Sequence, residues 1–122
     1  MALGGALGSV ARFATTGIAV RMFGAGFPWG TLLVNVFGSF AIGVLAAVAM
    51  PDGRPLLAGD ARAFVIVGVL GGFTTFSAFS VETLSLARNG AWLGAGANVL
   101  LSVVVCLVAV WLGYLTAAVL NR

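Results

Sequence analysis

A chain of 122 residues that is 61% hydrophobic and only 7% charged is not a soluble domain, because the surface of a soluble domain requires about a quarter of all residues to be charged. The net charge of +3 comes from scattered arginines, which excludes the basic cluster that binds nucleic acid. The single cysteine, Cys106, excludes an internal disulfide. We therefore expect residues 1–122 to form one membrane domain.

Four long apolar stretches follow one another along the chain. A bilayer core of about 30 Å is crossed by roughly 20 helical residues, and each stretch is long enough. Helices are the default because the backbone must satisfy its own hydrogen bonds in lipid, and the strict alternation typical of a membrane barrel is missing. The sequence therefore predicts an all-α polytopic membrane protein with four transmembrane helices, at residues 3–23, 28–50, 63–87 and 92–120.

The first stretch has a second interpretation, a cleaved signal peptide. Arg12 interrupts its apolar run, and three similar stretches follow, so a transmembrane helix is favoured. Small residues also recur four positions apart in these stretches, as in Gly4 with Gly8 and Gly68 with Gly72. In lipid, such spacing lets helix backbones approach closely, and tight packing accounts for most of the glycines.

The arginines do not determine the orientation of the four spans. An even number of spans places both termini and the second connector on one side, together with Arg54, Arg62 and Arg122, against Arg21 and Arg88 on the other. Topology normally follows a clear excess of basic residues, and three against two is no excess. A fixed topology set by other factors stays open, and so does insertion in both orientations, which would give an antiparallel dimer.

The middle of the third predicted helix contains the most unusual local sequence, Gly71-Gly72-Phe73-Thr74-Thr75. Glycine weakens a helix by about 1 kcal/mol relative to alanine, and β-branched threonines follow, so this Gly-Gly-x-Thr-Thr run predicts a helix broken in mid-membrane. Irregular backbone at that depth must be buried in protein or line a cavity, and its free carbonyl oxygens can hold a monovalent cation. The alternative is an intact helix whose hydroxyls bond the preceding turn.

Two phenylalanines follow this sequence and share one helix face, because Phe76 and Phe79 are three residues apart. The edge of an aromatic ring carries partial positive charge. Ring edges directed at a small anion would stabilise it without a full charge. Such a pair is ordinarily a core or lipid contact, and its place beside the predicted break favours the anion role.

Three further polar groups are costly at bilayer depth. Arg12 lies near the middle of its helix, where insertion of an arginine costs about 2.5–3.5 kcal/mol, so a vestibule or a backbone partner must receive it. The amide of Asn35 can donate to an anion or join helices, and Thr31 lies one turn away on the same face. Glu82 lies toward the end of the third helix, where a vestibule would place it.

Three segments with these residues resemble the CrcB/Fluc fluoride channels. The resemblance covers nearly the whole chain, and the third segment is highly specific. The order and spacing of all three make chance agreement improbable. The segments run from Gly4 to Phe13, from Gly30 to Gly38 and from Gly71 to Phe79.

This resemblance implies a dual-topology antiparallel homodimer in the bacterial inner membrane, with two fluoride pores and no nucleic-acid partner. It also implies a structural Na⁺ on the dimer axis, held by the backbone carbonyls of Gly71 and Thr74. Glu82 and Arg12 are assigned to the vestibule. The implied fluoride pathway comprises Asn35, Phe76, Phe79, Ser77, Ser102 and Thr31.

Such a channel exports fluoride passively. Hydrofluoric acid enters cells in its neutral form and ionises inside, and the membrane potential then drives the trapped anion out. Two positions depart from the family pattern: Ala78 replaces a common hydroxyl residue, and Cys106 stands where serine is sometimes found. These departures affect the details of the polar path.

Two other functions are alternatives to the channel. A small multidrug exporter shares the size and helix number, but it needs a carboxylate within the membrane to exchange drug for protons, and the first 51 residues contain no Asp or Glu. A noncatalytic assembly subunit would need no polar pore lining. Enzymatic catalysis is disfavoured because the chain has no His, and its serines lack an evident general base.

Overall fold

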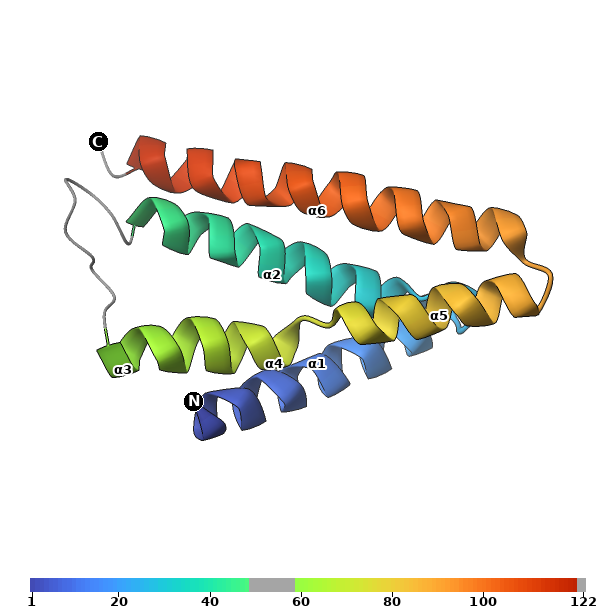
Figure 1. Ribbon diagram of the computed structural model, residues 1–122, viewed down its shortest axis with the longest axis horizontal. Coiled ribbons are helices and arrows are strands. Elements are labelled where there is room, and N and C mark those ends of the chain that lie inside the picture. Colours follow the sequence, from blue (N-terminus) through green and yellow to red (C-terminus); the bar gives the residue numbers. More distant parts are fainter. Residues whose placement is uncertain (49–58, 121–122) are drawn as a thin grey trace.

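In the computed structural model, residues 1–48 and 59–120 are described, and they are entirely helical apart from short connections and one break (Figure 1). Four helical spans are long and apolar enough to cross a membrane, which confirms the predicted class. The third span comprises α3, the π-helical segment η2, α4 and α5. The elements are α1 (Ala2–Phe23), α2 (Trp29–Val48), α3 (Gly59–Arg62), η2 (Ala63–Leu70), α4 (Gly71–Phe73), α5 (Phe76–Arg88) and α6 (Trp92–Leu120).

The observed bounds differ from the predicted ranges mainly in the third span. That span begins at Gly59 rather than at residue 63, because Gly59, with φ +59°, starts a polar helical turn before the apolar run. The start of α1 and the end of α6 lie toward the same end of the bundle in Figure 1, as four spans require. The predicted second connector, with Arg54, and the terminal Arg122 lie outside the described residues.

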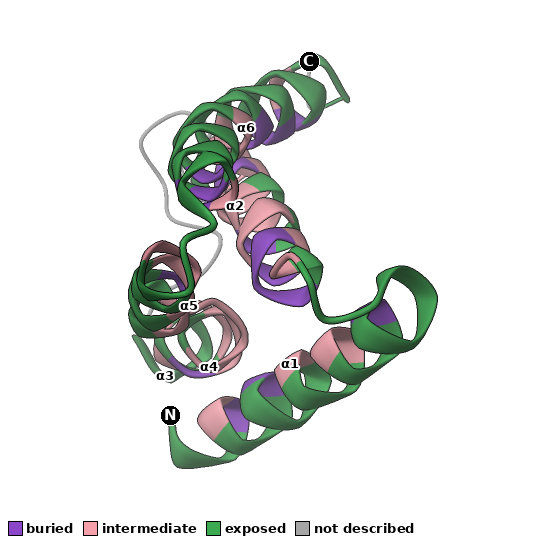
Figure 2. Ribbon diagram, turned by 90° about the vertical axis from the view of Figure 1, so that its right-hand side faces the viewer, coloured by how far each residue is buried: buried purple, intermediate pink, exposed green. Residues whose placement is uncertain are grey.

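The helices α2 and α6 run side by side in the same direction and form the most extensive helix pair (Figures 1 and 2). Glycines determine how closely they approach. A Cβ atom on Gly43 would collide with the carbonyl oxygen of Val110, and one on Gly113 with the carbonyl oxygen of Phe40. In lipid, this approach gains the dispersion contacts that hold helices together.

A second close contact joins α1 to the first half of the third span. A Cβ atom on Gly68 would lie 2.8 Å from the Met1 carbonyl oxygen, and one on Gly72 would lie 2.6 Å from the Gly5 carbonyl oxygen. Gly72 therefore serves helix packing. The first halves of these spans are held together by backbone contact rather than by large side chains.

The third span is broken as predicted, but the position of the break is two residues later than the glycine pair. Gly71 has helical torsion angles of −62° and −37°, whereas Thr74 (−86°, 156°) and Thr75 (−155°, 117°) are extended. The break therefore falls within the predicted run, at its threonines rather than at its glycines. The glycine pair remains helical in α4, and β-branched residues, which favour extended backbone, open the chain instead.

Much of each helix is exposed, as Figure 2 shows, and the exposed residues include many large apolar side chains. Leu93 is 92% exposed and Phe13 is 81% exposed. In a membrane-spanning chain, such side chains face lipid or another protein rather than water. The interior contacts are made largely by small residues.

The glycine contact between α2 and α6 can be tested with two substitutions on the same helix. We expect Gly113→Ala to lower the free energy of unfolding by about 1–3 kcal/mol, because the new methyl group meets backbone atoms of α2 that cannot move independently. Gly96→Ala is the matched control, since the space around Gly96 is open. Thermal unfolding in detergent compares the two, and equal midpoints would show that the close approach contributes nothing.

Candidate functional site

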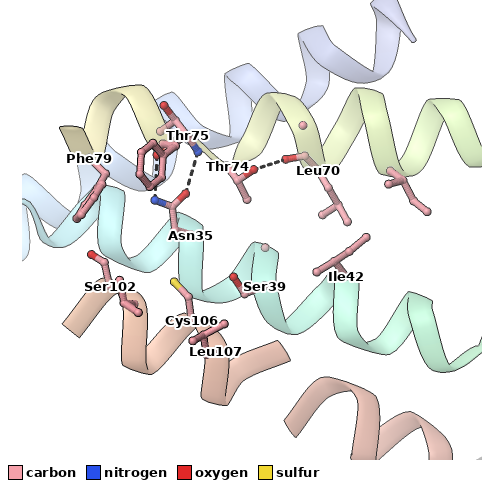
Figure 3. Close-up of a pocket in the computed structure, with 15 residues that line it drawn as sticks. Asn35, Ser39, Ile42, Leu70, Thr74, Thr75, Phe79, Ser102, Cys106 and Leu107 are labelled. Atoms are coloured by element: carbon pink, nitrogen blue, oxygen red, sulfur yellow. Dashed lines mark hydrogen bonds between the residues drawn. The ribbon is translucent and has the colours of Figure 1, made fainter. Parts of the chain in front are cut away.

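A cavity of about 550 Å³ lies between α2, the broken third span and α6 (Figure 3). Most of its lining is apolar, and a few amide, hydroxyl and thiol groups face it. Six of the predicted site residues line this cavity: Asn35, Gly71, Thr74, Phe76, Phe79 and Ser102. The structure thus brings together residues that are far apart in the sequence.

The side chain of Asn35 pairs with the backbone of Thr75 through two hydrogen bonds. Thr75 N–H donates to Asn35 Oδ1 at 2.8 Å, and Asn35 Nδ2 donates to the Thr75 carbonyl at 3.0 Å. These partners fix which end of the amide is oxygen, because a backbone N–H only donates and a carbonyl only accepts. Asn35 therefore satisfies both backbone groups of the extended residue, and one N–H of its amide is left over.

The break is also capped from within the third span. The Thr75 hydroxyl oxygen accepts from Ala78 N–H at 3.1 Å, as an N-cap residue does. On the other side of the break, the Thr74 backbone N–H and hydroxyl both donate to the Leu70 carbonyl, each at 2.9 Å. Gly38 leaves room on α2 for the methyl group of Thr74. The two threonines thus end one helix and begin the next.

These bonds release the two carbonyl oxygens that were predicted to hold a cation. In a continuous helix, the Gly71 carbonyl would accept from Thr75 N–H and the Thr74 carbonyl from Ala78 N–H. Asn35 takes the first N–H, and the Thr75 hydroxyl takes the second. Both oxygens are therefore available for another ligand.

The two predicted pore phenylalanines are in contact. The ring centroids of Phe76 and Phe79 are 5.2 Å apart, with an angle of 50° between the planes. Phe79 is 9% exposed, whereas Phe76 is 77% exposed. One ring therefore belongs to the interior of this chain, and the other lies on its open side.

A second cavity, of about 460 Å³, lies where α1, α2 and α5 meet near the connector between α1 and α2. Thr31 Oγ1 donates to Glu82 Oε1 at 2.8 Å, and both residues line this cavity. Within the described residues, Glu82 Oε2 is buried and has no hydrogen-bond partner. The cavity also receives polar side chains of Thr16, Ser85 and Asn89.

Two predicted site residues are placed apart from these cavities. Arg12 is half-buried on α1 and belongs to the lining of neither cavity described above. Ser77 is exposed, and its hydroxyl lies 3.2 Å from the Thr75 hydroxyl. Ser77 is therefore beside the break, whereas Arg12 is not brought together with Glu82.

Sequence reasoning missed several polar residues of this region. Asn98 is only 1% exposed; its amide donates to Thr83 Oγ1 at 2.9 Å and accepts from Ser102 Oγ at 3.4 Å. Thr75 and Ser39 were also overlooked as site residues. A signal for Asn98 is present on α6, where Asn98, Ser102 and Cys106 recur every four residues.

Comparison with known protein families gives a match over most of the chain. The model of the family described as "CrcB-like protein, Camphor Resistance (CrcB)" matches residues 1–114. The chain belongs to the CrcB family.

Curated relatives are similar over almost the whole length of this CrcB-family chain. A protein of Opitutus terrae is 59% identical over 99% of this chain and 92% of its own length. A protein of Rhodospirillum rubrum is 52% identical over 100% of this chain and 95% of its own length, and one of Methylocella silvestris is 50% identical over 98% and 92%. Each of the three is named "Fluoride-specific ion channel FluC".

The role of Asn35 at the break of this CrcB-family chain is testable through stability. We expect Asn35→Leu to lower the free energy of unfolding by about 2–4 kcal/mol, because each of two backbone groups left unpaired in an apolar site costs about 1–3 kcal/mol. Ser39→Ala is the matched control, since Ser39 lies one turn away in the same cavity and forms no hydrogen bond with the described residues. Denaturation in detergent measures both, and equal losses would contradict the pairing with Thr75.

Proposed function

We propose that this protein is a fluoride-selective ion channel of the bacterial inner membrane, which passively exports cytoplasmic fluoride and is not an enzyme. The observation that carries the proposal is the position of Asn35 and the two phenylalanines around one cavity at the break. High identity to proteins named as fluoride channels supports it. No nucleotide or coupled proton is needed, because the membrane potential drives the anion outward.

Fluoride gives up a strong hydration shell when it enters a narrow path, so the protein must offer replacement donors. The second N–H of Asn35 and the hydroxyls of Ser102 and Ser77 are such donors. The hydroxyl of Thr31 would join them only after releasing Glu82, to which it donates at 2.8 Å. The ring edges of the phenylalanine pair add partial positive charge without a full countercharge. A path lined this way binds the anion weakly at several positions, and weak multiple sites are what conduction requires.

The open side of the first cavity supports an antiparallel homodimer. Phe76 is largely exposed there, and a Cβ atom on Gly71 would meet nothing closer than 3.8 Å, so another backbone has room to approach. A second copy related by two-fold symmetry would cover this face and place the two cavities near one another. The even distribution of arginines between the two sides supports insertion in both orientations.

The same face has the donor set for a structural sodium ion on the dimer axis. Hard cations prefer oxygen ligands, and the carbonyl oxygens of Gly71 and Thr74 are released from helical hydrogen bonding by the bonds at the break. Two copies of this chain would supply four such oxygens. The ion would join the two subunits without any charged side chain.

The second cavity is the proposed vestibule, with Glu82 on its wall and bonded to Thr31. Thr31 and Asn35 are one helical turn apart on α2, so this cavity leads toward the break. Arg12 lines neither cavity of the single chain. In this proposal, Arg12 would therefore contribute to a vestibule only in the assembled dimer.

The function is tested by fluoride efflux from liposomes, measured with a fluoride electrode and with chloride as the control anion. We expect wild-type protein to release fluoride and to retain chloride. Phe76→Leu and Phe79→Leu should each slow fluoride efflux by about tenfold or more, equivalent to about 1.4 kcal/mol of lost stabilisation, because leucine has no positive ring edge. Phe13→Leu is the matched control, since Phe13 is exposed on α1. Unchanged flux in both pore variants would refute the ring-edge role.

The sodium site is tested by stability at constant ionic strength. We expect the purified dimer to unfold at higher temperature in sodium than in N-methylglucamine, with about 2.7 kcal/mol gained when sodium exceeds its Kd a hundredfold. Side-chain variants test this site poorly because its ligands are backbone atoms. Identical unfolding in both cations, together with a density map that has no central ion, would count against the site.

A further inference from the structure

The hydroxyl of Ser102 does not bond the backbone of its own helix, as many hydroxyls in this chain do. In a transmembrane helix, a serine or threonine hydroxyl commonly donates to the carbonyl four residues earlier. Six hydroxyls in this chain do so at 2.7–2.9 Å, those of Thr15, Thr16, Thr74, Ser80, Thr83 and Thr116. Ser102 instead donates to the side-chain oxygen of Asn98, at 3.4 Å.

The direction of each bond around Asn98 is fixed by its neighbours. Thr83 Oγ1 has one hydrogen, which it donates to the Phe79 carbonyl at 2.7 Å, so it accepts from Asn98 Nδ2 at 2.9 Å. The amide oxygen of Asn98 is therefore turned toward Ser102. Because Asn98 is 1% exposed, its side chain has little freedom to turn elsewhere.

We propose that Asn98 is a positioning residue, which keeps the Ser102 hydroxyl available to an anion in the cavity. The proposal rests on the proposed function, in which fluoride passes Ser102. By offering its side-chain oxygen, Asn98 holds Ser102 away from the short bond to the backbone carbonyl of residue 98. The substitute bond is long, and a hydrogen bond of that length is weak.

The weakness of this bond has a direct consequence for conduction. To donate to a passing anion, Ser102 must first release its present acceptor, and a 3.4 Å bond costs less to break than one of 2.7–2.9 Å. The Ser102 side chain lines the same cavity as Asn35 and Phe79. Asn98 thus acts on the anion only through Ser102, and through Thr83 it also ties α6 to the helix that carries Phe79.

A double-mutant cycle separates this role from simple packing. Fluoride efflux from liposomes is measured for wild type, Asn98→Leu, Ser102→Ala and the double variant. We expect Asn98→Leu to slow efflux about fivefold, since Ser102 then bonds its own backbone like the other six hydroxyls. In the Ser102→Ala background, the Asn98 substitution should have no further effect. Thr116→Val, which removes an exposed hydroxyl elsewhere on α6, should leave the rate unchanged.

Each other outcome overturns the inference. If the two substitutions reduce the efflux rate independently, so that their fold-changes multiply, Asn98 serves packing. The same conclusion follows if neither Asn98→Leu nor the smaller Asn98→Ala assembles in detergent. A wild-type rate in Asn98→Leu would show that the hydroxyl needs no positioning. If the wild-type protein passes no fluoride, the proposed function is overturned as well. If the wild type conducts and the effects of the two substitutions multiply, only the role of Asn98 is overturned.

Discussion

The need to satisfy two backbone groups in the middle of an apolar span governs this structure. At Thr75 the helix is open, and an unpaired N–H and C=O at that depth would each cost several kcal/mol, of the order that an apolar solvent imposes on a bare polar group. Asn35 pairs with both. One amide on a neighbouring helix therefore makes a broken span possible, and the same bonds release the Gly71 and Thr74 carbonyls for other ligands. The open backbone and the two released carbonyl oxygens both depend on this pairing.

A second constraint is that the helices approach one another through backbone atoms. Gly43 and Gly113 bring α2 against α6, and Gly68 and Gly72 bring the third span against α1. Helices held in this way leave few large side chains in the interior, so polar residues between them are separated by short distances. The break is fixed on one side by α1 packing and on the other by the amide of α2. The first half of the span is thus packed against α1, the opened residue Thr75 is held by hydrogen bonds to Asn35, and α5 packs against α6.

The sequence predicted the four spans because hydropathy and length are properties of each stretch alone. It also predicted Asn35, Ser102 and the two phenylalanines as neighbours, although only through resemblance to a family. The break lies within the predicted run from Gly71 to Thr75 but at its threonines: propensity identifies the glycines as weak points, Gly72 is packed against α1 in a helical turn, and the extended torsions fall on Thr74 and Thr75. The π-helical stretch at Ala63–Leu70 has no sequence signature. Asn98 was missed because its role depends on a hydrogen bond to Thr83, which is distant in the sequence and is brought near only by the fold.

Because α2 and α6 run in parallel, polar residues with the same spacing on each helix form two neighbouring rows. Thr31, Asn35 and Ser39 recur every four residues on α2, and Asn98, Ser102 and Cys106 recur likewise on α6. Both helices start at the same end of the bundle (Figure 1). Thr31 lines the cavity beside Glu82, and Asn35 and Ser39 line the cavity at the break, which Ser102 and Cys106 reach from α6. Hydroxyls bonded to their own helices are withdrawn from an anion path, so the residues that keep a hydroxyl free matter as much as the hydroxyls themselves. An anion passage between apolar helices can thus be built without basic side chains, provided that each donor is held by a bond weaker than the one that the anion offers.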